Sequence, residues 1–86
     1  MYKLILLPEA EKTYKKLCMR NKALFERIDA VLTALCENPL LGKSLKDKLK
    51  GKYSLRVGVY RIIYSFQKTR LVIYVLDIGH RREVYR

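Results

Sequence analysis

Apolar residues in the first half of the chain recur with the spacing of two amphipathic helices. Residues 2–7 form a short apolar run that stops at Pro8, and proline favours the first turn of a helix. We therefore expect a strand, followed by a helix over residues 9–20 whose apolar positions follow intervals of four, three and one. These positions are Ala10, Tyr14, Leu17 and Cys18. A second stripe with helical spacing covers residues 24–35 and ends before Pro39, which blocks continuation.

Apolar residues in the second half follow the two-residue period of strands instead. Residues 53–57 alternate between apolar and polar positions, and Gly58 can supply the positive φ of a tight hairpin. Residues 59–66 form the partner strand, and a polar turn follows at 67–70. Residues 71–78 are apolar at nearly every position, which indicates a strand in the centre of the sheet.

The predicted element order is β-α-α-β-β-β, in a single domain that spans residues 1–86. Two helices joined by a short link form an antiparallel hairpin, and both are expected to lie across the sheet because neither buries its stripe fully against the other. Between the helices and the strands, residues 40–52 carry five lysines among their last ten positions. We interpret this segment as a mobile basic loop, which is either a solvated linker or a binding surface.

Charge narrows the range of partners. The chain has 19 basic and 8 acidic residues and a net charge of +11, which opposes compaction unless an anionic partner offsets it. Nucleic acid is the first such partner to consider, and acidic proteins and anionic membrane surfaces also fit. No apolar run approaches the ~20 residues that span a bilayer, and the N-terminal stretch lacks the features of a signal peptide. We therefore expect a cytoplasmic protein that is not inserted in a membrane.

The usual catalytic and cofactor motifs are absent from the sequence. There is no Ser-His-Asp set, no paired carboxylates, no glycine-rich phosphate loop and no cluster of metal ligands. Cys18 and Cys36 are interpreted as small apolar residues on helix faces, since free cysteine often behaves as a buried hydrophobe. If the chain is an enzyme, its working groups are cationic or phenolic.

Cationic residues gather in and beside the predicted strands. They are Lys50, Lys52, Arg56, Arg61, Arg81 and Arg82, with His80 and Tyr85 in the last segment. RNA cleavage suits such a set, because the 2′-hydroxyl is the nucleophile and the protein supplies a base, an acid and cations for the transition state. Arginine gives fixed charge in bidentate geometry, and histidine titrates near neutral pH.

Tyrosines are frequent in the same half. They are Tyr53, Tyr60, Tyr64, Tyr74 and Tyr85. Each is able to stack on an unstacked base or to pack in the sheet, and most are expected to be structural because strands favour aromatic residues. Tyr85 is the exception, since it follows the last strand within the basic cluster.

Two motifs carry a resemblance to a known family. They are YSLRVGVYRIIY at 53–64 and VIYVLDIGHRREVYR at 72–86. In these residues, and in its element order, the chain resembles the RelE toxins of the RelE/ParE superfamily, the toxin halves of bacterial and archaeal toxin–antitoxin pairs. The resemblance implies an α+β fold in which a small antiparallel sheet has a helical hairpin packed on one face and the first strand joined beside the C-terminal strands.

The resemblance also implies an activity. It is cleavage of messenger RNA in the ribosomal A site, which inhibits translation and needs no metal or other cofactor. The family pattern falls on Lys52, Arg56, Arg61, Arg81 and Tyr85. Tyr85 becomes the candidate base or base-orienting group, and Arg81 the candidate acid or charge stabiliser. His80 is added because related toxins use a histidine in acid–base roles. The expected RNA contacts are Lys46, Lys48, Lys50, Arg82 and Arg86.

The chain departs from the family pattern at two places. Ser54 stands where some members have a second lysine, and the chain stops one residue after Tyr85. The implied partners are the ribosome, messenger RNA and a RelB-like antitoxin, with a monomeric toxin inside the toxin–antitoxin complex. Two alternatives stay open: a ParE-like inhibitor of DNA gyrase, and a catalytically inactive member that binds antitoxin or RNA.

Overall fold

The structure is a computed structural model and describes residues 1–80. Its main elements are β1 (Lys3–Leu6), α1 (Pro8–Arg20), α2 (Lys22–Glu37), β2 (Lys43–Ser44), β3 (Tyr53–Val57), β4 (Tyr60–Gln67) and β5 (Val72–His80). Two short 3-10 turns, η1 (Pro39–Leu41) and η2 (Asp47–Leu49), flank β2. The predicted helical hairpin and the strands after it are confirmed.

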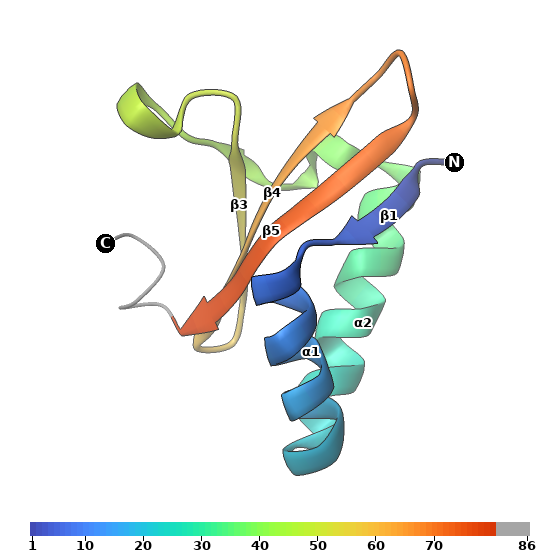
Figure 1. The fold of residues 1–86 in the computed structure, drawn as a ribbon, viewed down its shortest axis with the longest axis vertical. Helices are drawn as coiled ribbons and strands as arrows, with labels where there is room; N and C mark the ends of the chain where they lie inside the picture. Colours follow the sequence, from blue (N-terminus) through green and yellow to red (C-terminus); the bar gives the residue numbers. More distant parts are fainter. Residues whose placement is uncertain (81–86) are drawn as a thin grey trace.

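The strands form one sheet in the order β1-β5-β4-β3-β2. Helices α1 and α2 pack on one face of it, and no helix of the described residues covers the other face (Figure 1). The prediction that β5 is paired on both sides is confirmed, since it lies between β1 and β4, although the middle strand of the five is β4. The sheet is mixed rather than wholly antiparallel, because β1 pairs with β5 in parallel. A first strand that connects through helices instead of a tight turn is free to pair in this direction.

The core lies between the two helices and the sheet. Its fully buried residues include Ile28, Leu32 and Leu35 on α2, and Ile62, Ile73 and Val75 on the strands. On α1, Ala10 and Leu17 are buried whereas Cys18 is exposed, so the expectation that Cys18 faces the core is wrong. A helix turns about 100° per residue, which carries the position after Leu17 out of the interface.

The hydroxyl of Tyr64 fixes the segment after α2 to the sheet. It donates to the Pro39 carbonyl at 2.7 Å and accepts from the Gly42 amide at 2.8 Å. Burial raises the pKa of Tyr64, against a smaller lowering by the Gly42 hydrogen bond. Tyr64 has no exposed surface, so it takes the structural role expected of most strand tyrosines and is not available to stack on a base.

Residues 40–52 are not irregular throughout, which corrects the prediction of a loop. The segment contains the end of η1 and the whole of η2, and β2 extends the sheet by pairing with β3. Its lysines are nevertheless exposed at Lys43, Lys46, Lys48 and Lys50. The segment therefore presents positive charge from a backbone that is tied to the edge of the sheet.

Candidate functional site

Two arginines face each other across β3 and β4. Arg56 is the direct cross-strand partner of Arg61, and Arg61 is paired on its other side with Gly79 of β5. Successive strand residues point to opposite faces, and Ile62 is buried in the core beneath the helices, so Arg61 points to the face without helices. Like charges directly opposite each other are destabilising. Stability alone therefore does not explain this pair.

A second row of residues lies beside the arginines on the same face. Across the strands from β2 to β5, this row is Lys43, Ser54, Ile63 and Asp77. Ser54 and Ile63 are 5% and 6% exposed and form the floor of the face. The two rows together, Arg56–Arg61–Gly79 and Lys43–Ser54–Ile63–Asp77, are called the arginine face below.

Ser54 contacts the guanidinium of Arg61 directly. Arg61 Nη1 donates to Ser54 Oγ at 3.2 Å, which holds the guanidinium over the buried floor of the arginine face. A serine at this position accepts the hydrogen bond without adding a third cation beside the arginine pair. Ser54 therefore gives the Arg61 guanidinium a neutral contact.

The other predicted site residues are not all gathered at this point. Lys52 directly precedes β3 and continues the alternation of Ser54 and Arg56, but it lies four residues along the chain from Arg56, or about 13 Å in an extended strand. His80 pairs with Tyr60 across the strands, and their rings are arranged edge to face with their centroids 6.2 Å apart. Because His80 follows Gly79 in the strand, its side chain lies on the helix face rather than the arginine face.

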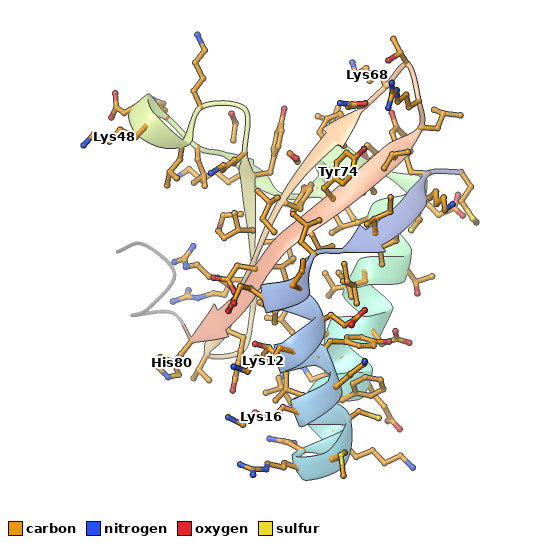
Figure 2. The ribbon with its side chains drawn as sticks, viewed as in Figure 1. Lys12, Lys16, Lys48, Lys68, Tyr74 and His80 are labelled. Atoms are coloured by element: carbon orange, nitrogen blue, oxygen red, sulfur yellow. The ribbon has the colours of Figure 1, made fainter. Side chains whose placement is uncertain are left out.

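The lysines around η2 lie at the beginning of β3, whereas Arg56 and Arg61 lie toward its end. Figure 2 shows Lys48 beside η2 and His80 at the far end of β5, well apart from each other. The remaining candidates, Arg81, Arg82, Tyr85 and Arg86, lie outside the described residues. In the sequence they follow directly on the Gly79–His80 end of β5, which the register places beside Arg61.

The sequence-based prediction missed three features of the arginine face. They are the buried hydroxyl of Ser54 as a partner of Arg61, Lys43 on a strand of its own, and Asp77 next to the arginine row. Asp77 had a usable signal, because it is the only acidic residue in an otherwise apolar strand. Lys43 had none, since two-residue strands carry no readable period.

The described residues contain no group of three or more His, Cys, Asp or Glu side chains placed to hold a metal ion. No helix among them has the length and apolar character needed to cross a membrane.

Comparison with known proteins places the chain in a family. The model of the ParE toxin of the type II parDE toxin–antitoxin system matches residues 4–85. The chain belongs to this toxin family. Within the wider RelE/ParE superfamily, it is 36% identical to Toxin RelG of Mycobacterium tuberculosis over 53 residues, 60% of this chain and 61% of RelG. It is 33% identical to Toxin RelE of the same organism over 60 residues, 69% of this chain and 62% of RelE.

The chain therefore spans about three fifths of the length of these curated relatives. Its fold matches that in the crystal structure of the RelBE2 toxin–antitoxin complex of M. tuberculosis, with a TM-score of 0.80 and 26% identity. That match covers 93% of this chain and 98% of the other. The α+β fold of a RelE-like toxin, with its helical hairpin on one face of the sheet, is confirmed.

Proposed function

We propose that this type II toxin is a ribosome-dependent endoribonuclease that cleaves messenger RNA in the A site. The observation that carries the proposal is the arginine pair: Arg56 and Arg61 lie directly opposite each other on the face without helices, and Ser54 holds the Arg61 guanidinium. Two cations at adjacent strand positions form a binding site for an anion with concentrated charge. A phosphodiester approaching its transition state has that charge.

The proposed reaction uses the RNA's own nucleophile. The 2′-oxygen forms a bond to phosphorus, the bond from phosphorus to the 5′-oxygen breaks, and the products carry a 2′,3′-cyclic phosphate and a 5′-hydroxyl. One group accepts the 2′-hydroxyl proton and another protonates the departing 5′-oxygen. Arg61 stabilises the charge on the equatorial oxygens, since its charge is fixed and its geometry bidentate.

Residues of the terminal segment complete the proposed site. Tyr85 is the proposed base or base-orienting group, and Arg81 the proposed acid or charge stabiliser. Gly79, the strand neighbour of Arg61, has no side chain to cover the guanidinium. His80 lies on the other face and is the least supported member of the catalytic set.

The message would follow the arginine face toward the basic segment. Lys52 and Lys43 lie between the arginine pair and the exposed lysines Lys46, Lys48 and Lys50. Lysine and arginine contacts to phosphate give affinity without reading sequence, so this path suits a message whose sequence varies. Arg82 and Arg86 are proposed to add such contacts from the terminal segment.

Substitution of Arg61 tests the proposal. Purified variants are compared for cleavage of a message during in vitro translation. Arg61→Ala is expected to lower the cleavage rate by a factor of roughly 10²–10³, the usual cost of removing one transition-state donor. The matched control is Arg70→Ala, an exposed arginine in the turn between β4 and β5, which should cleave like the parent. Equal rates for Arg61→Ala and the parent protein would refute the role of the arginine pair.

An antitoxin of RelB type is the proposed partner, with one toxin copy acting as a monomer within the complex. The similarity to the toxin in the RelBE2 complex supports this partner, as does the net charge of +11, which an acidic segment offsets. A disordered acidic segment that folds as it binds the toxin would neutralise this charge.

Inhibition of DNA gyrase is the second candidate function. It is favoured by one observation, the match of the ParE toxin model over residues 4–85. A supercoiling assay distinguishes the two: inhibition of gyrase at low toxin concentration with the message intact supports the ParE-like function. If the protein neither cleaves message nor inhibits gyrase but still binds antitoxin or RNA, it is an inactive member of the family.

A further inference from the structure

A cavity lies on the helix face of the sheet, between α1 and the adjoining ends of β4 and β5. Its volume is about 330 Å³. The lining combines an apolar floor with a polar rim: Leu17, Tyr60 and Ile78 form the floor, and Thr13, Lys16 and His80 form the rim. Leu17 and Ile78 also belong to the hydrophobic core.

The cavity is separated from the arginine face by the sheet. Tyr60 and Arg61 are consecutive in β4 and therefore point to opposite faces, as do Gly79 and His80 in β5. A molecule in the cavity thus touches Tyr60 and His80 without meeting Arg56 or Arg61. The cavity shares with the site proposed for RNA cleavage only Gly79 and His80, the least supported member of the catalytic set.

A row of basic residues on α1 runs past the cavity. Lys12, Lys16 and Arg20 are spaced four residues apart and lie on one side of the helix, and all three are exposed. Figure 2 shows Lys12 and Lys16 projecting from α1 on the side where β5 ends at His80. This row is called the α1 stripe. Like charges at this spacing cost about 0.2–0.5 kcal/mol per pair.

Lys15, on the same helix, differs from the residues of the α1 stripe because it forms an ion pair. Its ammonium pairs with Glu11 at 3.3 Å, four residues earlier. In the part of the chain that the structure describes, Lys12, Lys16 and Arg20 have no acidic side chain at ion-pair distance. Glu9, three residues before Lys12 in the helix, is exposed. The charge of the α1 stripe is therefore available to an external anion.

We infer that the cavity and the α1 stripe together bind an acidic peptide segment that inserts one apolar or aromatic side chain into the cavity. Carboxylates before and after this anchor residue contact Lys12, Lys16 and Arg20. The inference rests on the proposed function in one respect: if the chain acts with an antitoxin, that protein is the natural source of the segment. A nucleotide fits the floor less well, because Leu17 and Ile78 offer no hydrogen-bonding partner to the edges of a base.

The chain contains no tryptophan, which gives a direct readout. A synthetic peptide of ten residues, with one central tryptophan and glutamate or aspartate elsewhere, is titrated with the full chain while its fluorescence is recorded. The expected result is a blue shift of the tryptophan emission on binding, since the indole leaves water for the apolar floor. The same peptide with alanine in place of tryptophan, used as a competitor, should bind more weakly.

Two variants of neighbouring lysines separate the site from general charge attraction. Lys16→Glu is expected to weaken the peptide by at least about fivefold, and Lys15→Glu by less than about twofold, although both change the net charge equally. Thr13→Phe narrows the cavity from its rim and should remove the blue shift. Circular dichroism and thermal melting verify that each variant is folded.

Three results of the peptide titration would overturn the inference. They are binding without a blue shift, equal weakening by Lys16→Glu and Lys15→Glu, and a blue shift that survives in a folded Thr13→Phe protein. A single-stranded RNA that displaces the peptide and discriminates between the same two lysine variants would make this a nucleic-acid site and also overturn it. The titration contains no ribosome or message, so its failure leaves the nuclease proposal unaffected. Failure of the cleavage assay likewise leaves the peptide-binding inference unaffected.

Discussion

Replacing Ser54 by alanine tests whether its hydroxyl positions Arg61 for catalysis. The substitution removes the acceptor of the 3.2 Å hydrogen bond from Arg61 Nη1. Hydrogen bonds to charged groups contribute about 1.5–3 kcal/mol, and this one is at the long end of the usual range. We take the lower limit, which corresponds to a fall of roughly tenfold in the rate of cleavage.

The assay is single-turnover cleavage of a message on programmed ribosomes, at several protein concentrations. The hydroxyl is not proposed to touch the RNA, so the maximal single-turnover rate constant should fall roughly tenfold, while the protein concentration that gives half of it stays within about twofold. A residue that acted only through stability would instead lower the amount of folded protein and leave the rate per folded molecule unchanged. The melting temperature of the variant is therefore measured alongside.

Ser44→Ala is the matched control, because Ser44 is an exposed serine on β2 that pairs with Tyr53 rather than with the arginine row. This control should cleave at the parental rate. A Ser54→Ala protein that cleaves as fast as Ser44→Ala would refute the positioning role of Ser54.

Three further predictions concern the fold that supports the site. Tyr64→Phe loses the hydrogen bonds to Pro39 and Gly42 and should lower the free energy of unfolding by about 2–3 kcal/mol, as measured by urea denaturation. A loss below about 0.5 kcal/mol would show that these two hydrogen bonds do not hold the segment to the sheet. Gly42→Ala places a Cβ 2.5 Å from the Tyr64 hydroxyl and should destabilise the protein by about 1–3 kcal/mol; an unchanged melting temperature would show that the segment shifts freely. Burial and then the hydrogen bond to Asp29 raise the pKa of Tyr14 to about 12, from 10.0. Because the folded pKa is the higher one, this contribution to stability is complete below pH 10 and is lost between pH 10 and 12, so the urea midpoint should fall more in the parent than in Tyr14→Phe over that range.

Periodicity predicted the helices and long strands because their burial repeats over many residues. Ile28, Leu32 and Leu35 are apolar at helical spacing and all are buried, and Gly58 adopts the positive φ of 61° expected in the hairpin. Cys18 was misplaced because an apolar stripe read from sequence is wider than the strip of helix that contacts the sheet.

The rest depended on contacts between distant residues. The parallel pairing of β1 with β5 joins strands that are far apart in the sequence, and β2 is too short to carry a pattern. The contact of Ser54 with Arg61 was not predicted, although the resemblance pointed to both positions, because a side-chain hydrogen bond has no sequence period. Likewise His80 is adjacent to the basic cluster in sequence but lies on the helix face, since strand alternation decides the face and proximity in sequence does not.

We propose that this toxin cuts translated message by attack of the 2′-hydroxyl, with Arg61 stabilising the transition state. The most direct measurement is to map new 5′ ends on a defined message after in vitro translation with the purified protein, and to repeat it with ribosomes omitted. The account predicts 5′-hydroxyl ends within codons that appear only when ribosomes are present and that are lost with Arg61→Ala. An intact message in the presence of translating ribosomes, or cuts that Arg61→Ala leaves unchanged, would contradict it.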